Sequence, residues 1–175
     1  MSNRGFLAVI AAVAVVGLLG FGLIAKGGAE LAIGDPAPDG PVERLDGGGQ
    51  GSLADYRGKW LLVNFWASWC RPCEEESPTI ERYADEHRDN LVVIGINSED
   101  NTEDATGFIE DNGLSWEFFK DTNDDRAEDF GVLGLPESFL VDPDGNLAQL
   151  FRGPIDRDYL DEFVTPLITA SGAPA

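Results

Sequence analysis

The chain has 175 residues, of which 43% are hydrophobic, and this length and composition indicate one globular domain with an appendage and argue against disorder. Its 32 acidic and 12 basic residues give a formal net charge of −20, which repels phosphate backbones and anionic lipid head groups and so argues against nucleic acid as a partner. A basic protein surface is compatible with this charge, but the charge alone identifies no substrate.

The N-terminal segment is predicted to be a membrane anchor. Residues 5–25 contain no charged residue, and as a helix they would be roughly 31 Å long, close to the thickness of the bilayer hydrocarbon layer. We expect a single-pass transmembrane helix with residues 1–4 in the cytoplasm, because Arg4 and the amino terminus are positively charged. The alternative is a cleaved signal peptide, with a cleavage site near residues 27–29. Either alternative places the rest of the chain outside the cytoplasm.

A tether connects this segment to the domain. Residues 26–51 are rich in glycine, proline and alanine and are predicted to be that tether, with order beginning near Ala32 and a short strand at residues 42–45. The domain itself is predicted over residues 52–175, with a short flexible tail at its end. It opens with a capping-box pattern at residues 52–55, which predicts one helical turn.

A strand, a helix and a second strand follow. Residues 60–66 are apolar at nearly every position, as expected for a central strand that is covered on both faces. Residues 71–87 are predicted to form a helix and residues 91–96 a second buried strand. This order implies that the two strands are parallel.

The remaining elements complete a compact domain. They are a helix at 102–112, a short strand at 116–119, a helical segment at 124–130 and strands at 137–141 and 147–151. The turn-forming residues 142–145 (DPDG) favour an antiparallel hairpin between the last two strands. Residues 156–169 are predicted to be an amphipathic helix whose last turn is disturbed by Pro166.

The only two cysteines lie in Trp69-Cys70-Arg71-Pro72-Cys73, where the first buried strand leads into the first long helix. A C-x-x-C pair at this place can close a small disulfide ring, and the start of the helix favours a thiolate on the first sulfur. We therefore expect a redox-active dithiol with Cys70 as the nucleophile and Cys73 as the resolving thiol. A permanent disulfide is the structural alternative. Zinc would need four ligands, and a glutamate follows Cys73 where covalent haem attachment needs a histidine.

Two segments resemble a known group of proteins. The segment from Asn64 to Pro78, NFWASWCRPCEEESP, is similar to the active-site segment of the membrane-tethered thiol-disulfide oxidoreductases of the TlpA/ResA/CcmG (DsbE) group. The segment from Gly134 to Asp142, GLPESFLVD, is similar to the second signature of that superfamily. The resemblance implies a thioredoxin-like α/β fold, in which helices flank a central mixed β-sheet, and a protein-disulfide reductase that needs neither cofactor nor metal.

The resemblance also implies roles for residues around the dithiol. Pro136 is expected to have a cis peptide bond, to face the dithiol and to bind substrate together with Leu135 and Trp69. Without the resemblance, Pro136 would be an ordinary trans proline at the start of a strand. Glu76 lies three residues after Cys73 on the same side of the helix, and it is expected to exchange a proton at the active site. The alternative is that Glu76 only complements the positive end of the helix.

The expected activity is the reduction of disulfides in exported proteins. The resemblance implies apocytochrome c as the client and a membrane thiol transporter as the reductant. A thiol oxidase is the nearest alternative, because one fold spans potentials from about −270 to about −120 mV. A peroxide reductase would need a lone cysteine in a Thr-x-x frame. A copper carrier lacks a third ligand, because His87 lies 14 residues beyond Cys73, about 21 Å along a helix.

Overall fold

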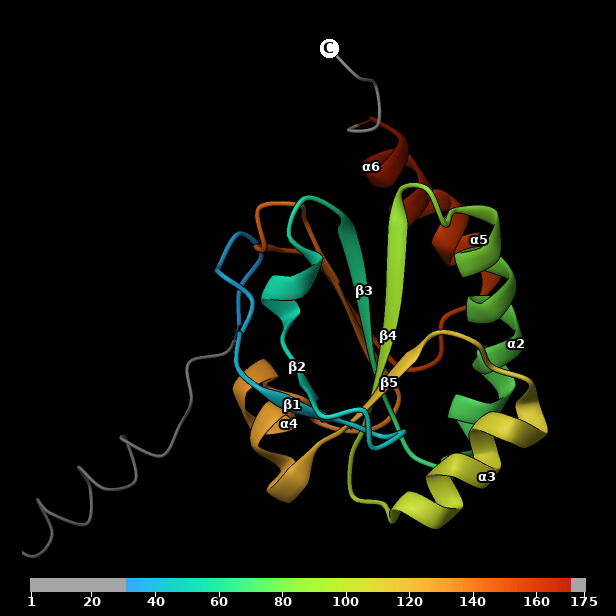
Figure 1. Cartoon of the computed structure of the whole chain (residues 1–175). Coiled ribbons are helices and arrows are strands. Elements are labelled where there is room, and N and C mark those ends of the chain that lie inside the picture. Colours follow the sequence, from blue (N-terminus) through green and yellow to red (C-terminus); the bar gives the residue numbers. More distant parts are fainter. Residues whose placement is uncertain (1–30, 171–175) are drawn as a thin grey trace, which may run out of the picture. The chain divides into compact units, whose positions relative to one another are not determined.

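The structure is a computed structural model that describes residues 31–170, so the predicted cytoplasmic segment 1–4 and transmembrane segment 5–25 lie outside the described residues, as do residues 171–175. A seven-stranded mixed sheet has the order β2-β1-β5-β4-β3-β6-β7 (Figure 1). Its strands are β1 (Val42–Arg44), β2 (Gln50–Gly51), β3 (Trp60–Trp66), β4 (Leu91–Asn97), β5 (Glu117–Lys120), β6 (Glu137–Val141) and β7 (Leu147–Arg152). The long helices are α2 (Arg71–Glu86) and α3 (Thr102–Asn112). The short helices before the C-terminal part are η1 (Leu53–Tyr56), η2 (Thr122–Asp124) and α4 (Asp125–Phe130). Within residues 31–170 no helix is long and apolar enough to cross a bilayer.

β3 lies inside the sheet because it is apolar along its whole length. Every residue of β3 after Trp60 is buried. The strand pairs in parallel with β4, which follows it through α2, and antiparallel with β6. The predicted central strand and the predicted parallel pair are therefore confirmed.

The side chains of β3 alternate between two layers that cover the sheet. Val63 and Phe65 belong to the layer that also contains Phe130 of α4, whereas Leu62 and Trp66 belong to clusters that also contain residues of α2. In Figure 1, α2, α3 and the C-terminal helices lie on one side of the sheet, and η1 and α4 lie on the other. Because strand side chains alternate, Asn64 faces the α2 layer, where the cysteine-bearing helix packs.

Two short strands within the segment assigned to the tether, β1 and β2, belong to the sheet, and β1 corresponds to the short strand expected at residues 42–45. β1 pairs antiparallel with β5, and β2 pairs antiparallel with β1. This addition covers the edge of β5, which would otherwise present unpaired backbone groups. Upstream, Pro36 forms an isolated bridge with Asn146, and Leu31 packs against the core. The described residues of this segment are thus part of the fold from the point near Ala32 at which order was expected.

The C-terminal part contains the predicted hairpin and a helix that differs from its prediction. β6 and β7 are antiparallel, and Gly145 in their turn has a φ of 87°, a left-handed conformation that glycine adopts without strain. Instead of one regular helix, the chain forms α5 (Arg157–Tyr159), a π turn at Leu160–Val164 and α6 (Thr165–Ala170). A proline ring clashes with the carbonyl four residues earlier in a regular helix, and here a wider turn precedes Pro166. The disturbance therefore begins one turn earlier than expected.

Candidate active site

The two cysteines lie where the loop after β3 enters α2. Cys70 is the N-cap residue of α2, and Pro72 occupies the first turn, where a missing N–H leaves no helical hydrogen bond unmade. The two sulfurs form a disulfide with a Cα–Cα distance of 5.3 Å. Cys70 is 4% exposed and Cys73 is 1% exposed, so Cys70 is the more accessible of the two.

The start of α2 provides a positive environment for Cys70. The N–H of Cys73 donates a hydrogen bond to the Cys70 sulfur at 3.3 Å, and the helix macrodipole is positive at this end. When the disulfide opens, both effects favour a thiolate on Cys70 over a neutral thiol. The Arg71 side chain extends into solvent, where it is 86% exposed, and its guanidinium pairs with Glu75 at 3.0 Å. We therefore assign it no part in stabilising the Cys70 thiolate.

The second sequence segment lies beside the disulfide. The Leu135–Pro136 peptide bond is cis, and Leu135 packs against the apolar cluster that contains Cys70 and Cys73. The carbonyl of Pro136 accepts a hydrogen bond from the N–H of Gly153 at 2.9 Å, which ties this loop to the residue after β7. The structure thus brings together the two segments on which the resemblance depends.

A groove of about 210 Å³ extends from this loop to Trp69, and we call it the Trp69 groove. It is lined by Trp69, Ser98, Glu99, Asp124, Ala127, Val132, Leu133, Gly134 and Leu135. Trp69 and Leu133, with exposures of 59% and 80%, are two of the five large hydrophobic residues that are exposed within residues 31–170, and both line this groove. Two of the three residues expected to bind substrate, Trp69 and Leu135, line the groove, whereas Pro136 is buried next to Leu135. The sequence did not predict that Leu133, Glu99 and Asp124 line this groove. The only local signal was the position of Leu133 in a glycine-containing loop, where an apolar side chain can be exposed.

Glu76 lies one turn after Cys73 in α2 and is buried. Its carboxylate accepts hydrogen bonds from the side-chain amide of Asn64 at 2.8 Å and from the N–H of Ile155 at 2.7 Å. The same amide group donates to the hydroxyl of Ser138 at 2.9 Å. Burial raises the pKa of Glu76 to about 7, although the hydrogen bonds from Ile155 and Asn64 favour its charged form. The side chain therefore titrates in the neutral range.

An ion pair with a buried carboxylate supports the cis-proline loop. Glu137, which directly follows Pro136, is bound by Arg152 of β7 through both carboxylate oxygens, at 3.0 and 3.1 Å. One of these oxygens also accepts a hydrogen bond from the N–H of Leu133 at 3.0 Å. The Glu137 side chain is 4% exposed and that of Arg152 is 35% exposed. This pair, which the sequence did not predict, connects the exposed wall of the Trp69 groove to the sheet.

Removal of the cation should destabilise the domain. Arg152→Met is expected to lower the free energy of unfolding by about 2–3 kcal/mol, because Glu137 would remain buried without its cation. The control is Arg88→Met, which removes an exposed pair with Asp85 and should cost less than about 0.5 kcal/mol. Urea unfolding of the oxidised full chain measures both values, and equal effects of the two substitutions would show that Glu137 does not depend on Arg152.

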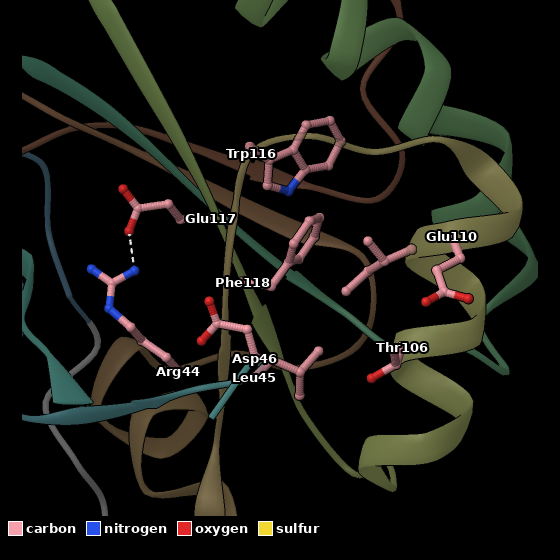
Figure 2. Close-up of a pocket in the computed structure, with 9 residues that line it drawn as sticks. Arg44, Leu45, Asp46, Thr106, Glu110, Trp116, Glu117 and Phe118 are labelled. Atoms are coloured by element: carbon pink, nitrogen blue, oxygen red, sulfur yellow. Dashed lines mark hydrogen bonds and ion pairs between the residues drawn. The ribbon is translucent and has the colours of Figure 1, made fainter. Parts of the chain in front are cut away.

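A second cavity, of about 280 Å³, lies between α3 and the part of the sheet near β1 and β5 (Figure 2). Figure 2 shows Trp116 and Phe118 on one side and Thr106 and Glu110 of α3 on the other. The ring of Phe118 packs on Trp66, a member of the cysteine-containing cluster, with centroids 5.4 Å apart. A Cβ atom at residue 95 would lie 2.6 Å from the Phe118 ring, so the glycine there permits this packing. None of the residues predicted for the active site lines this cavity.

The described residues offer no centre for a metal ion. Within residues 31–170 no group of three or more His, Cys, Asp and Glu side chains is arranged to hold one. His87 is the C-cap of α2, at the opposite end from Cys70, and its ring packs on Tyr83 with centroids 4.2 Å apart.

Disulfide exchange is the chemistry that this fold and these two sulfurs support, and the protein is a thiol-disulfide oxidoreductase with a thioredoxin-like fold. The AhpC/TSA family matches residues 33–150, and the chain belongs to this family. Within it, the chain is similar to proteins of the ResA and DsbE type, which confirms the resemblance found in the sequence.

Three relatives illustrate this similarity. The thiol-disulfide oxidoreductase ResA of Bacillus thuringiensis subsp. konkukian is 29% identical over 167 residues, which are 93% of this chain and 95% of ResA. The thiol:disulfide interchange protein HelX of Rhodobacter capsulatus is 34% identical over 140 residues, which are 79% of this chain and 78% of HelX. A crystal structure described as a thiol:disulfide interchange protein DsbE from Chlorobium tepidum has a TM-score of 0.74 at 27% identity, and the match covers 79% of this chain and 99% of that one.

Proposed function

We propose that this protein reduces disulfide bonds in exported proteins outside the cytoplasm, with apocytochrome c as a client. The observation that carries the proposal is the position of the disulfide at the start of α2, beside a groove with two exposed apolar residues, Trp69 and Leu133. Exposed apolar surfaces of this kind are typical of protein contact sites. The resemblance to the TlpA/ResA/CcmG group supports the choice of client.

The reaction starts from the reduced enzyme. The Cys70 thiolate attacks one sulfur of the client disulfide, which forms a mixed disulfide and releases the other client sulfur as a thiolate that takes up a proton. Cys73 then loses its proton and attacks the Cys70 sulfur, so that the client leaves as a dithiol and the enzyme disulfide forms. Two electrons pass from enzyme to client, and the oxidised pair in the structure corresponds to the enzyme product of this reaction.

Glu76 is proposed to accept the proton that Cys73 loses. Its place one turn after Cys73 and its pKa of about 7 suit a group that both takes up and releases protons near neutral pH. Asn64, which cannot ionise, holds the carboxylate by donating a hydrogen bond to it.

Trp69, Leu135 and Pro136 are proposed to hold an extended segment of the client. In the resembled group the backbone before the cis proline pairs with the substrate, and Leu135 takes that position here. Glu99 and Asp124 are the charged residues of the groove, and their carboxylates favour a client with basic residues near its disulfide.

The N-terminal segment is proposed to hold this activity at the membrane. Residues 5–25 would form a single-pass anchor with residues 1–4 in the cytoplasm and the catalytic domain outside it. Each turnover consumes two electrons, and the proposed source is a thiol transporter in the same membrane. The long charge-free run and the resemblance support this arrangement.

The reduction potential of the Cys70–Cys73 pair tests the direction of the reaction. The full chain in detergent is equilibrated with a series of glutathione mixtures, and the oxidised fraction is measured by thiol alkylation. We expect a potential near the reducing end of the known range, about −270 mV, and a value near −120 mV would identify an oxidase instead. Cys70→Ala serves as the control, since it removes the couple and should show no transition.

A further inference from the structure

Two loops lie side by side at the edge of the active site. The loop after β3 contains Ser68 and Trp69 and leads to Cys70, and the loop after β4 contains Glu99 and Asp100. Because β3 and β4 are parallel neighbours, both loops leave the sheet at the same end. We call the contacts between these two residue pairs the loop clasp.

Asp100 makes the first half of the clasp. One oxygen of its carboxylate accepts a hydrogen bond from the N–H of Ser68 at 2.6 Å, and the other accepts from the Ser68 hydroxyl at 3.0 Å. The same carboxylate also accepts from the side-chain amide of Asn97 at 2.9 Å and from the N–H of Asn101 at 2.8 Å. All four groups that face Asp100 are therefore donors.

These donors keep Asp100 charged. Burial works to raise the pKa of Asp100, but the hydrogen bonds from Asn97, Ser68 and Asn101 together hold it below its ordinary value. Hydrogen bonds to an ionised acceptor are stronger than neutral ones. The connection to Ser68 is thus maintained throughout the neutral pH range.

Glu99 makes the second half of the clasp. Its carbonyl accepts a hydrogen bond from the indole N–H of Trp69 at 3.0 Å. Its backbone has a φ of 52°, a conformation that is rare for residues other than glycine, and its N–H donates to the side chain of Asp124 at 3.2 Å. An indole ring that is more than half exposed is therefore held at its nitrogen by an adjacent loop.

We propose that Asp100 is a positioning residue for client binding: by holding Ser68, it keeps Trp69 in place as a preformed wall of the Trp69 groove. This inference rests on the proposed function, because it assigns client recognition to that groove. A preformed wall lowers the entropy that binding must remove, so loss of the clasp should weaken client binding and leave the chemistry at the sulfurs intact.

The geometry separates this role from helix capping. The N-cap residue of α3 is Asn101, whose side chain accepts from the N–H of Asp104 at 2.9 Å. Asp100 precedes the cap, and two of its four hydrogen bonds reach back to Ser68, 32 residues earlier in the chain. Its carboxylate therefore connects two loops in addition to ordering its own.

The test compares the reduction of a protein disulfide with the reduction of a small-molecule disulfide. In Asp100→Asn, an NH₂ group replaces one carboxylate oxygen and faces a hydrogen-bond donor. Ser68→Ala removes the hydroxyl that donates to Asp100. The control is Glu103→Gln, which removes an exposed charge three residues after Asp100. Each full-length variant in detergent is assayed with insulin and with oxidised glutathione. NMR hydrogen exchange of the Trp69 indole N–H follows the clasp itself, and thermal unfolding checks the fold.

For Asp100→Asn we expect KM for insulin to rise about tenfold with kcat unchanged within twofold, the glutathione reaction unchanged and faster exchange at Trp69. Ser68→Ala should have a smaller effect of the same kind, the double variant should be no worse than Asp100→Asn, and the control should match the wild type. An unchanged KM for insulin in a folded Asp100→Asn variant would overturn the inference, as would equal losses with both substrates. If the wild type itself fails to reduce insulin, the proposed function fails, and the inference that rests on it fails too.

Discussion

The full chain with Cys73→Ala should accumulate client proteins joined to Cys70 by a disulfide. The Cys70 thiolate can still attack a client, but no second thiol remains in the chain to release the mixed disulfide. Steady-state reduction of insulin should fall by at least about 10³-fold, because the two sulfurs act as one unit. The trapped proteins are separated on non-reducing gels and identified by mass spectrometry after expression in an exporting host.

The matched control is Cys70→Ala, which keeps Cys73. Cys73 is the more buried of the two cysteines and lies within α2 instead of at its N-cap, so this variant should trap few clients. Equal trapping by the two variants would contradict the assignment of Cys70 as the nucleophile. If Cys73→Ala binds only abundant proteins and no apocytochrome c, the proposal that apocytochrome c is a client loses its support.

Glu76→Gln should change how stability depends on pH. The pKa of Glu76 in the folded protein is about 7, above its ordinary value of 4.5, so between these values the folded state binds more protons than the unfolded state. The contribution of Glu76 is therefore greatest below about pH 4.5 and is lost as the pH rises through about 7. The cost of ionising the buried group is on the order of 3 kcal/mol. The variant, which has no charge to bury, should lack this loss.

Urea unfolding of the oxidised chain between pH 4.5 and 8 measures this effect. The difference in unfolding free energy between Glu76→Gln and the wild type should shift in favour of the variant by on the order of 3 kcal/mol across that interval. Glu74→Gln, which removes an exposed charge from the same helix, is the control variant. A difference for Glu76→Gln that does not change with pH would mean that Glu76 does not titrate in this range.

The same substitution should affect turnover. If Glu76 accepts the Cys73 proton, the rate of insulin reduction by the wild type should rise with pH around 7. Glu76→Gln should be slower by about 10²-fold, and its rate should lack this rise. The rate is measured with excess reductant, so that the enzyme is fully reduced at the start. A variant that keeps the wild-type rate and pH profile would confine Glu76 to a structural role.

The central strands and the dithiol were predictable because their signals are local. The apolar runs 60–66 and 91–96 match β3 and β4 to within one residue, since burial on both faces leaves few polar residues in such strands. The helix of residues 102–112 ends where expected because Gly113 adopts the left-handed C-cap conformation. The C-x-x-C spacing identifies the dithiol without any long-range information.

Contacts between distant segments were not predictable in this way. Asp100 and Ser68 are 32 residues apart, and Glu76 and Ile155 are 79 residues apart. Glu76 was singled out by its spacing from Cys73 and by the resemblance, but no local signal indicated its hydrogen bond to Ile155. Acidic residues are so frequent in this chain that nothing local distinguished Asp100 from the exposed ones. The environments of Glu76 and Asp100 follow from the order and register of the strands. The expected short strand at residues 42–45 corresponds to β1, whereas β2 was not predicted, because a two-residue strand in a glycine-rich segment carries little strand signal of its own.

The hydrogen bond from Ile155 to Glu76 has a consequence for how this protein matures. The donor belongs to the segment between β7 and the final helix, one of the last parts of the domain to be synthesised. Both sulfurs are in place much earlier, when the first half of the chain has been made. The environment that raises the pKa of Glu76 is therefore complete only after the C-terminal segment has docked, and a chain that is still incomplete would possess the thiols without the tuned carboxylate.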